Sequence, residues 1–197
     1  MGEMKSAFER AMERAEKLGK ATEDDLTKWK YVPEGEALGA RYLRDDCDLD
    51  AELRKYDDSV RKYVVEGVAT VLVRNLGLPR NEAAKKLNKK AMEAIKELKR
   101  DKVGVENTYS KLRRVFNHYL HEGEQQRKQA HEALKIDVEQ KMRQAMKKEM
   151  GQSAASARIN VEAQPQFQQE WRRVLSQLES QYGKLLEEYK QELLRAT

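Results

Sequence analysis

The sequence predicts an all-α protein, on the evidence of its composition and of the spacing of its apolar residues. Three prolines and ten glycines in 197 residues leave long stretches without a helix breaker. Charged residues make up 37% of the chain and apolar residues 39%, a balance that suits elongated helices with one face in water. We therefore predict a compact helical portion over residues 1–106 and a long antiparallel, coiled-coil-like helical hairpin over residues 107–197, with a linker near residues 151–165.

Three short helices are predicted in the N-terminal part. The first covers residues 3–18, where Phe8, Met12 and Leu18 share one helical face. The second begins at Thr22, a favourable N-cap, and ends before Pro33, because the residue before a proline avoids helical geometry. Pro33 is suited to begin the third helix, over residues 34–44.

An acidic connector over residues 45–50 leads into a helix predicted over residues 51–76. The segment 63–73 is rich in valine, so a β-strand is a competing interpretation. No second strand-like segment of similar strength is available to pair with it, and a lone strand cannot satisfy its backbone hydrogen bonds. We therefore favour a buried central helix.

The next predicted helix starts after Asn81, a plausible N-cap, and runs to about Arg100. Its apolar face consists of Ala84, Leu87, Ala91, Ala94, Ile95 and Leu98. Six basic residues accompany that face and are candidates for phosphate contacts: Lys85, Lys86, Lys89, Lys90, Lys96 and Arg100. Glu82, Glu93 and Glu97 interrupt the basic surface, which favours a solvated or internally paired face.

The C-terminal half contains the two longest predicted helices, over residues 107–150 and from Pro165 almost to the end. Apolar residues of the second helix follow steps of three and four: Phe167, Trp171, Val174, Leu178, Tyr182, Leu185, Tyr189 and Leu193. The pattern repeats after eleven residues, which corresponds to ~3.67 residues per turn and predicts a nearly straight hairpin.

Two segments carry a resemblance to a known family. The stretch Gly2-Glu3-Met4-Lys5-Ser6-Ala7-Phe8-Glu9-Arg10 and its continuation to Leu18, together with Pro165-Gln166-Phe167-Gln168-Gln169-Glu170-Trp171-Arg172 and Gln181-Tyr182, resemble a family of bacterial conserved hypothetical proteins. This is a group with a domain of unknown function whose members share this length and helical character. The resemblance implies an all-helical fold. It assigns neither an activity nor functional residues to this chain.

Three histidines raise the question of a zinc site. His118, His121 and Glu122 fall within five residues, but the zinc-protease pattern of two histidines four apart around a glutamate is absent. His131 lies too far along the helix to complete a set of four ligands. The cluster is explained by polar residues on a solvated helix face.

Alternating aspartates suggest the start of a calcium loop. Asp46, Asp48 and Asp50 alternate as in such loops, but Ala51 stands where glycine is needed and Asp57 where a glutamate should be. Carboxylates at a helix start are the simpler interpretation. We expect no metal and no cofactor, and no catalytic motif is recognisable.

Charge and cysteine content indicate the environment of the protein. Residues 1–60 carry 11 basic and 16 acidic side chains, whereas residues 61–100 carry 11 and 4, so the two regions are suited to pair within or between chains. Cys47 is the only cysteine, which fits a reducing cytoplasm. No apolar run approaches a membrane span of ~20 residues, and the first residues do not look like a signal peptide.

These observations favour a non-enzymatic cytoplasmic interaction or scaffold protein that acts through its C-terminal hairpin. We expect it to bind a protein partner or to self-associate as a homo-oligomer. The candidate partner-binding residues are Met142, Met146, Trp171, Tyr182 and Tyr189. The alternative is a nucleic-acid or ribosome-associated factor that uses the basic residues of helix 82–100.

Overall fold

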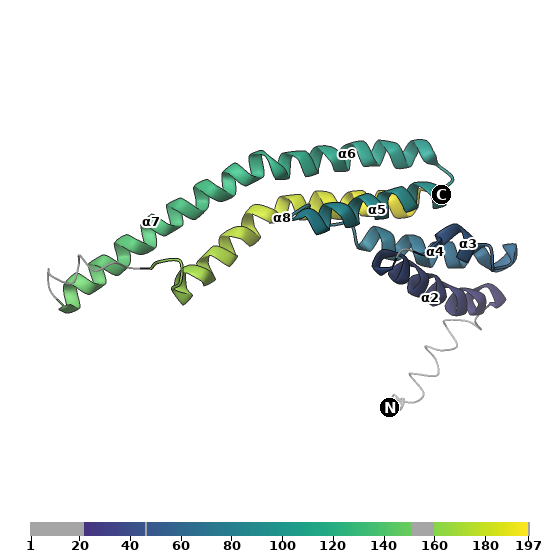
Figure 1. The fold of residues 1–197 in the computed structure, drawn as a ribbon, viewed down its shortest axis with the longest axis horizontal. Coiled ribbons are helices and arrows are strands. Elements are labelled where there is room, and N and C mark those ends of the chain that lie inside the picture. The colour runs from purple at the N-terminus through teal and green to yellow at the C-terminus, as the bar shows by residue number, and fades with distance from the viewer. Residues whose placement is uncertain (1–21, 46, 151–159, 197) are drawn as a thin grey trace, which may run out of the picture. The chain divides into compact units, whose positions relative to one another are not determined.

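The computed structural model describes residues 22–45, 47–150 and 160–196, with the side chains of residues 149 and 150 excluded. These ranges contain helices α2 (Glu23–Arg44), α3 (Leu49–Leu53), α4 (Asp58–Arg74), α5 (Glu82–Leu98), α6 (Lys102–Leu120), α7 (Glu122–Met150) and α8 (Pro165–Arg195) (Figure 1). No strand occurs in them, so the all-α prediction is confirmed, including the helix over the valine-rich segment. The predicted helix 3–18 lies outside the described residues.

The chain divides between Leu72 and Val73 into two compact units. In the first unit, α2 and α4 approach so closely that only glycine fits at their contacts. A Cβ atom on Gly35 would overlap the carbonyl oxygen of Val64, and one on Gly67 would overlap that of Val32. The close approach brings backbone against backbone and buries the glycines themselves.

The prediction that a helix ends before Pro33 is wrong. α2 is one helix of 22 residues with Pro33 inside it. Proline removes one intrahelical hydrogen bond and crowds the preceding turn, at a cost of ~3 kcal/mol. The contacts of Gly35 and Gly39 with α4 follow directly after Pro33, and this packing holds the backbone helical where local preference alone would break it.

The predicted helix 51–76 is also two helices in the structure. α3 ends at Leu53, and α4 begins at Asp58 after a turn. The carboxylate of Asp48 caps α3 by accepting a hydrogen bond of 3.0 Å from the backbone N–H of Ala51. Asp48 therefore has the helix-capping role that its position suggested.

In the second unit, a buried asparagine fixes the connection that precedes α5. The side chain of Asn88 accepts a hydrogen bond from the N–H of Gly77 (2.9 Å) and donates one to the carbonyl of the same residue (2.7 Å). Asn81 caps α5 as predicted, because its side chain accepts from the N–H of Ala84 at 2.8 Å.

The single helix predicted over residues 107–150 begins earlier and is interrupted once. α6 starts at Lys102, and the helical geometry changes at His121, where φ is −100° and ψ is −76°. The hydroxyl of Tyr182 on α8 lies 3.0 Å from where a Cβ atom on Gly123 would sit. The interruption therefore lies close to the point where Tyr182 of α8 packs against the backbone of Gly123.

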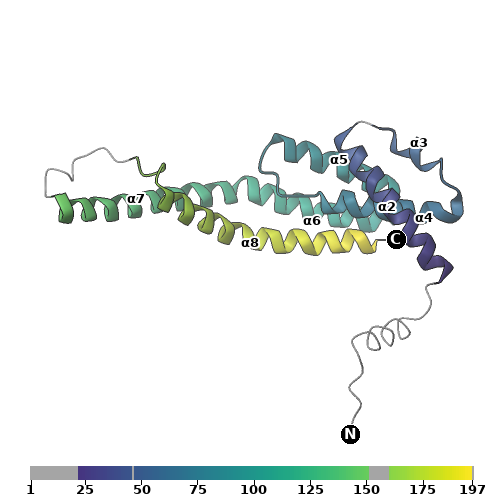
Figure 2. The same cartoon turned by 90° about the horizontal axis from the view of Figure 1, so that it is seen from below.

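α8 runs beside α6 and α7 in the opposite direction, as both views show (Figures 1 and 2). Contacts from the middle of α6 into the first half of α7 meet successively earlier residues of α8. They are the Lys111–Glu192 ion pair at 2.9 Å, the hydrogen bond from the Tyr119 hydroxyl to Glu179 at 2.7 Å, and the edge contact of His131 with Phe167, with ring centroids 5.2 Å apart.

Two apolar clusters hold these helices together. One contains Val115, Tyr119 and Tyr182, with Leu78 and Tyr189 against it. The other contains Val138, Val161 and Phe167, with Leu134, Met142 and Trp171 against it. The apolar stripe seen in the sequence of α8 is thus used largely for packing within the unit.

Candidate functional site: a groove between α5 and α6

Helices α5 and α6 enclose a groove of about 430 Å³ on the second unit. A short connection joins the two helices at one end, and the groove extends from there toward Pro79 and Leu120. Its lining combines apolar, basic and acidic side chains: Pro79, Lys85, Asn88, Lys89, Met92, Glu93, Lys96, Glu106, Tyr109, Arg113, Phe116 and Leu120. A volume of this size lies within the range of ligand sites.

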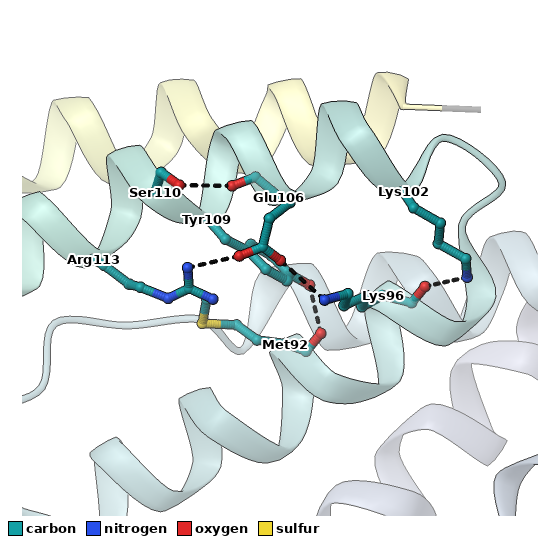
Figure 3. A network of polar contacts seen from close by, with 7 residues as sticks. All are labelled: Met92, Lys96, Lys102, Glu106, Tyr109, Ser110 and Arg113. Atoms are coloured by element: carbon teal, nitrogen blue, oxygen red, sulfur yellow. Dashed lines mark hydrogen bonds and ion pairs between the residues drawn. The ribbon is translucent and has the colours of Figure 1, made fainter.

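Polar contacts tie the two helices together at the end nearest the connection (Figure 3). The buried Tyr109 donates its hydroxyl hydrogen to the carbonyl of Met92 at 2.6 Å. The carboxylate of Glu106 accepts from Lys96 at 3.2 Å and from Arg113 at 2.8 Å. One carboxylate therefore joins a cation of α5 to a cation of α6.

The connection itself is fixed by capping contacts. Asp101 accepts a hydrogen bond from the N–H of Gly104 at 2.8 Å and so caps α6. The ammonium of Lys102 donates to the carbonyls of Lys96 and Glu97 in the last turn of α5. A cation at a helix C-terminus is favourable for the helix dipole, so these contacts support the end of α5 as well.

Glu106 and Tyr109, at this end of the groove, have shifted pKa values. Hydrogen bonds from Arg113 and then Lys96 lower the pKa of Glu106 below its usual value. Burial, followed by the charge of Glu106, raises the pKa of the Tyr109 phenol. At neutral pH, Glu106 is therefore an anion and Tyr109 a neutral hydrogen-bond donor.

The other end of the groove is apolar at its base and basic at its rim. Phe116 and Leu120 are half-buried, and their exposed surface faces the groove. Lys85 and Lys89 are exposed on α5. Each has a carboxylate neighbour on its own helix: Glu82 at 2.7 Å from Lys85 and Glu93 at 3.9 Å from Lys89.

The structure brings together part of the predicted basic set. Lys85, Lys89 and Lys96 line the groove, whereas Lys86, Lys90 and Arg100 do not contribute to its lining. Sequence reasoning missed the wall supplied by α6. Its signal was present, since Tyr109, Arg113, Phe116 and Leu120 recur at steps of four, three and four and so share one helix face.

Four of the five predicted partner-binding residues lie elsewhere, between α7 and α8 or between α6 and α8. Met142 and Trp171 are half-buried against the cluster around Phe167. Tyr182 is buried in the cluster around Tyr119, and Tyr189 packs against it. Met146 is half-buried on α7. Four of the five therefore have packing roles within the unit, and their binding of a partner stays a prediction.

A second hollow, of about 560 Å³, lies between α6, α7 and α8. It is lined by Arg114, Val115, His118, Gln126, Gln177, Leu178, Gln181, Tyr182 and Leu185. Glutamine amides make up a third of this lining, and Tyr182 in it is already hydrogen-bonded at 2.8 Å to the Nδ1 atom of His118. The lining of this hollow is more polar than that of the groove between α5 and α6.

The histidines considered as metal ligands contact aromatic rings. Besides the contact of His118 with Tyr182, His131 meets the rings of Phe167 and Trp171 edge-on, with centroids 5.2 and 4.9 Å away. Within residues 22–45, 47–150 and 160–196, no three His, Cys, Asp or Glu side chains form a group suited to a metal ion. His118, His121 and Glu122 are exposed, as predicted for a solvated helix face, although His118 also contacts Tyr182 of α8. His131 is half-buried against α8.

Comparison with known proteins adds a family. The sequence model of a family of unknown function, DUF6657, matches residues 50–195. The chain belongs to DUF6657. No curated protein and no solved structure matches the chain.

The DUF6657 match includes every residue of the groove, whereas α2 precedes it. Among the helices that the structure describes, none combines the length and the apolar character that a membrane crossing requires.

Proposed function

We propose that this DUF6657 chain is a non-enzymatic cytoplasmic interaction protein. Its C-terminal helical hairpin, formed by α6, α7 and α8, acts as the scaffold. The groove between α5 and α6, one wall of which belongs to the hairpin, binds an acidic amphipathic helix of a partner protein. The observation that supports this proposal is a groove with an apolar base and a rim richer in cations than in carboxylates.

The dimensions of the groove suit a short helix. From Lys85 to Lys96, α5 spans about 16 Å at ~1.5 Å per residue, which equals three helical turns. A helix of that length presents apolar side chains at positions i, i+3 or i+4 and i+7 to one face. Met92, Phe116 and Leu120 provide the apolar surface against which such side chains would pack.

Charge selects the kind of helix. Four cations line the groove, namely Lys85, Lys89, Lys96 and Arg113, against the carboxylates Glu93 and Glu106. At one end of the groove, Glu106 already forms ion pairs with two of those cations, Lys96 and Arg113. Lys85 and Lys89 at the other end are exposed, so acidic residues beside the apolar stripe of the partner would meet complementary charge there.

The protonation states support binding in preference to acid–base chemistry. A general acid or base works best with a pKa near the operating pH. The pKa of Glu106 is lowered and that of Tyr109 is raised, so both pKa values lie farther from pH 7 than the usual values of these groups. Their hydrogen bonds hold the two helices in position.

A nucleic-acid partner is the second candidate, supported by the three groove lysines and by the exposed Lys86 and Arg100. Single-stranded RNA would bind with a steep dependence on salt and would use base stacking on aromatic rings. Carboxylates beside Lys85, Lys89 and Lys96 reduce the attraction for phosphates, which places this candidate below the acidic helix.

The test uses a fluorescent 18-residue helical peptide with leucines at i, i+3, i+7 and glutamates on both flanks. We expect the full chain to bind it, and Phe116→Glu to weaken binding at least about tenfold by placing a charge on the apolar base. Val103→Glu is the matched control, because Val103 is exposed on the same helix outside the groove and its change should leave binding intact.

Anisotropy titrations measure binding, and circular dichroism checks that each variant is folded. Equal binding of a peptide with lysines in place of the glutamates would contradict the charge argument. Tighter binding of an RNA oligonucleotide, lost on Lys85→Glu and Lys86→Glu, would replace the proposal with the second candidate.

A further inference from the structure

Helix α2 carries two apolar faces on opposite sides. The inner face, with Gly35, Leu38 and Gly39, is buried against α4. The outer face is a stripe of five exposed residues: Leu26, Trp29, Pro33, Ala37 and Ala40. These residues follow steps of three, four, four and three, which keeps them on one side of the helix over about 21 Å.

The exposure of the stripe is unusual for its composition. The relative accessible surface of Trp29 is 66% and that of Leu26 is 54%. Single exposed apolar residues are common, but a continuous stripe with a tryptophan marks an interaction surface. Tryptophan is also among the residues that dominate the energy of interfaces.

Charges beside the stripe indicate what covers it. At 100° per residue, Asp25 and Glu36 lie on one flank of the stripe and Lys30 and Arg41 on the other. Each cation follows an acid by five residues. Glu23 and Glu34 also lie toward the basic flank, Glu23 at the first residue of the helix and Glu34 farther round the helix, where its carboxylate hydrogen-bonds the hydroxyl of Tyr56.

We infer that the outer face of α2 pairs in parallel with α2 of a second copy of this chain. In a parallel pair the acidic flank of each helix faces the basic flank of the other, and the five-residue offset places Asp25 opposite Lys30 of the second copy, and Glu36 opposite its Arg41. An antiparallel pair would instead place acid against acid. The self-complementary charge pattern therefore favours a second copy of this chain as the partner, and a parallel orientation of the two α2 helices.

Each of these four charged side chains already has a contact within its own chain, and the pairing would add to these contacts. Asp25 accepts hydrogen bonds from Thr22, which lower its pKa and keep the carboxylate ionised at neutral pH. Arg41 already shares Glu52 at 2.9 Å, so the pair between Asp25 and Lys30 contributes more to the dimer. Ala37 and Ala40 are small and let the helix backbones approach.

Sedimentation velocity on the full chain between about 1 and 200 μM tests the inference. We expect a concentration-dependent dimer, and Trp29→Glu to raise its dissociation constant at least about tenfold. Val103→Glu is the control, because it places the same charge at a residue that is 72% exposed and outside the stripe, and should leave the dimer intact. Circular dichroism confirms that both variants are folded.

Direction is tested by a cysteine at Ala40 in a chain whose Cys47 is replaced by serine. A parallel dimer brings both copies of residue 40 together, so Ala40→Cys should cross-link with itself on oxidation. Ala83→Cys, on the exposed side of α5, should not. A dimer without the cross-link at residue 40 would overturn the parallel arrangement.

A monomer at 200 μM would overturn the inference, whatever covers the stripe. Blue-shifted Trp29 emission in that monomer would indicate coverage by the chain itself, and binding of the monomer to vesicles of anionic lipid would indicate a membrane surface. The second tryptophan is replaced in this measurement by Trp171→Phe, so that the emission comes from Trp29 alone.

Discussion

Glu106 joins the two walls of the groove through its charge, beside the hydrogen bonds of Tyr109 and Lys102. Its carboxylate accepts from Arg113 on its own helix and from Lys96 on α5. Asn88 has a comparable role at the base of α5, where both its hydrogen bonds go to the backbone of Gly77. The spacing of residues in the sequence indicates neither role, because Lys96 lies ten residues from Glu106 and Gly77 eleven residues from Asn88, each outside the helix of its partner.

The charge of Glu106 should make part of the stability depend on pH. Because its pKa in the fold lies below the usual value of 4.5, its carboxylate stabilises the fold above that pH, and the stabilisation is lost as the pH falls through the folded value. We expect Glu106→Gln to lower the free energy of unfolding at pH 7 and to change it less at pH 3, measured by urea denaturation at both pH values.

The control for this prediction removes the main cause of the shift. In a chain with Arg113→Gln, adding Glu106→Gln should produce a smaller difference between pH 7 and pH 3, because Arg113 contributes most to lowering the pKa. An equal effect of Glu106→Gln at both pH values in the unmodified Arg113 background would show that the carboxylate acts by shape and not by charge.

Helices show where sequence patterns suffice and where they do not. The apolar steps of α8 and the Asn81 cap predicted those elements, because both signals act within a few residues. Pro33 was misinterpreted because the packing that keeps α2 helical comes from α4, about thirty residues later. The groove was half predicted: the lysines of α5 were recognised as a candidate surface, while the wall from α6 was not.

The contact between α2 and α4 predicts a sensitive position at Gly67. A methyl group there would overlap the backbone carbonyl of Val32, and backbone cannot move as a flexible side chain does. We expect Gly67→Ala to lower the free energy of unfolding by about 3 kcal/mol, the upper end for overpacking. Chemical denaturation followed by circular dichroism measures this change.

Gly183→Ala is the matched control for that substitution. Gly183 is an exposed glycine inside α8, and nothing lies within 4 Å of an added Cβ atom. The same chemical change should stabilise the protein there by ~0.5–1 kcal/mol, because alanine favours helix more than glycine does. If Gly67→Ala were as well tolerated as Gly183→Ala, α2 and α4 would not approach as closely as described.

At the scale of the whole molecule, the two proposed surfaces belong to different units of the chain. The groove consists of residues 79–120, in the second unit, and the α2 stripe of residues 26–40, in the first. The DUF6657 match includes the groove and leaves out the stripe. Binding of an acidic helix and self-association should therefore respond to different substitutions.

Two variants, each expected to affect only one of the two activities, test this independence. Trp29→Glu should abolish the dimer in sedimentation while changing the affinity for the glutamate-flanked peptide by less than about twofold, and Phe116→Glu should do the reverse, since sites without shared contacts act additively. Loss of both activities in both variants, with circular dichroism unchanged, would mean that peptide binding requires the dimer. In that case the acidic helix would be recognised by an assembly of two chains, and the groove of one chain would not be a sufficient site.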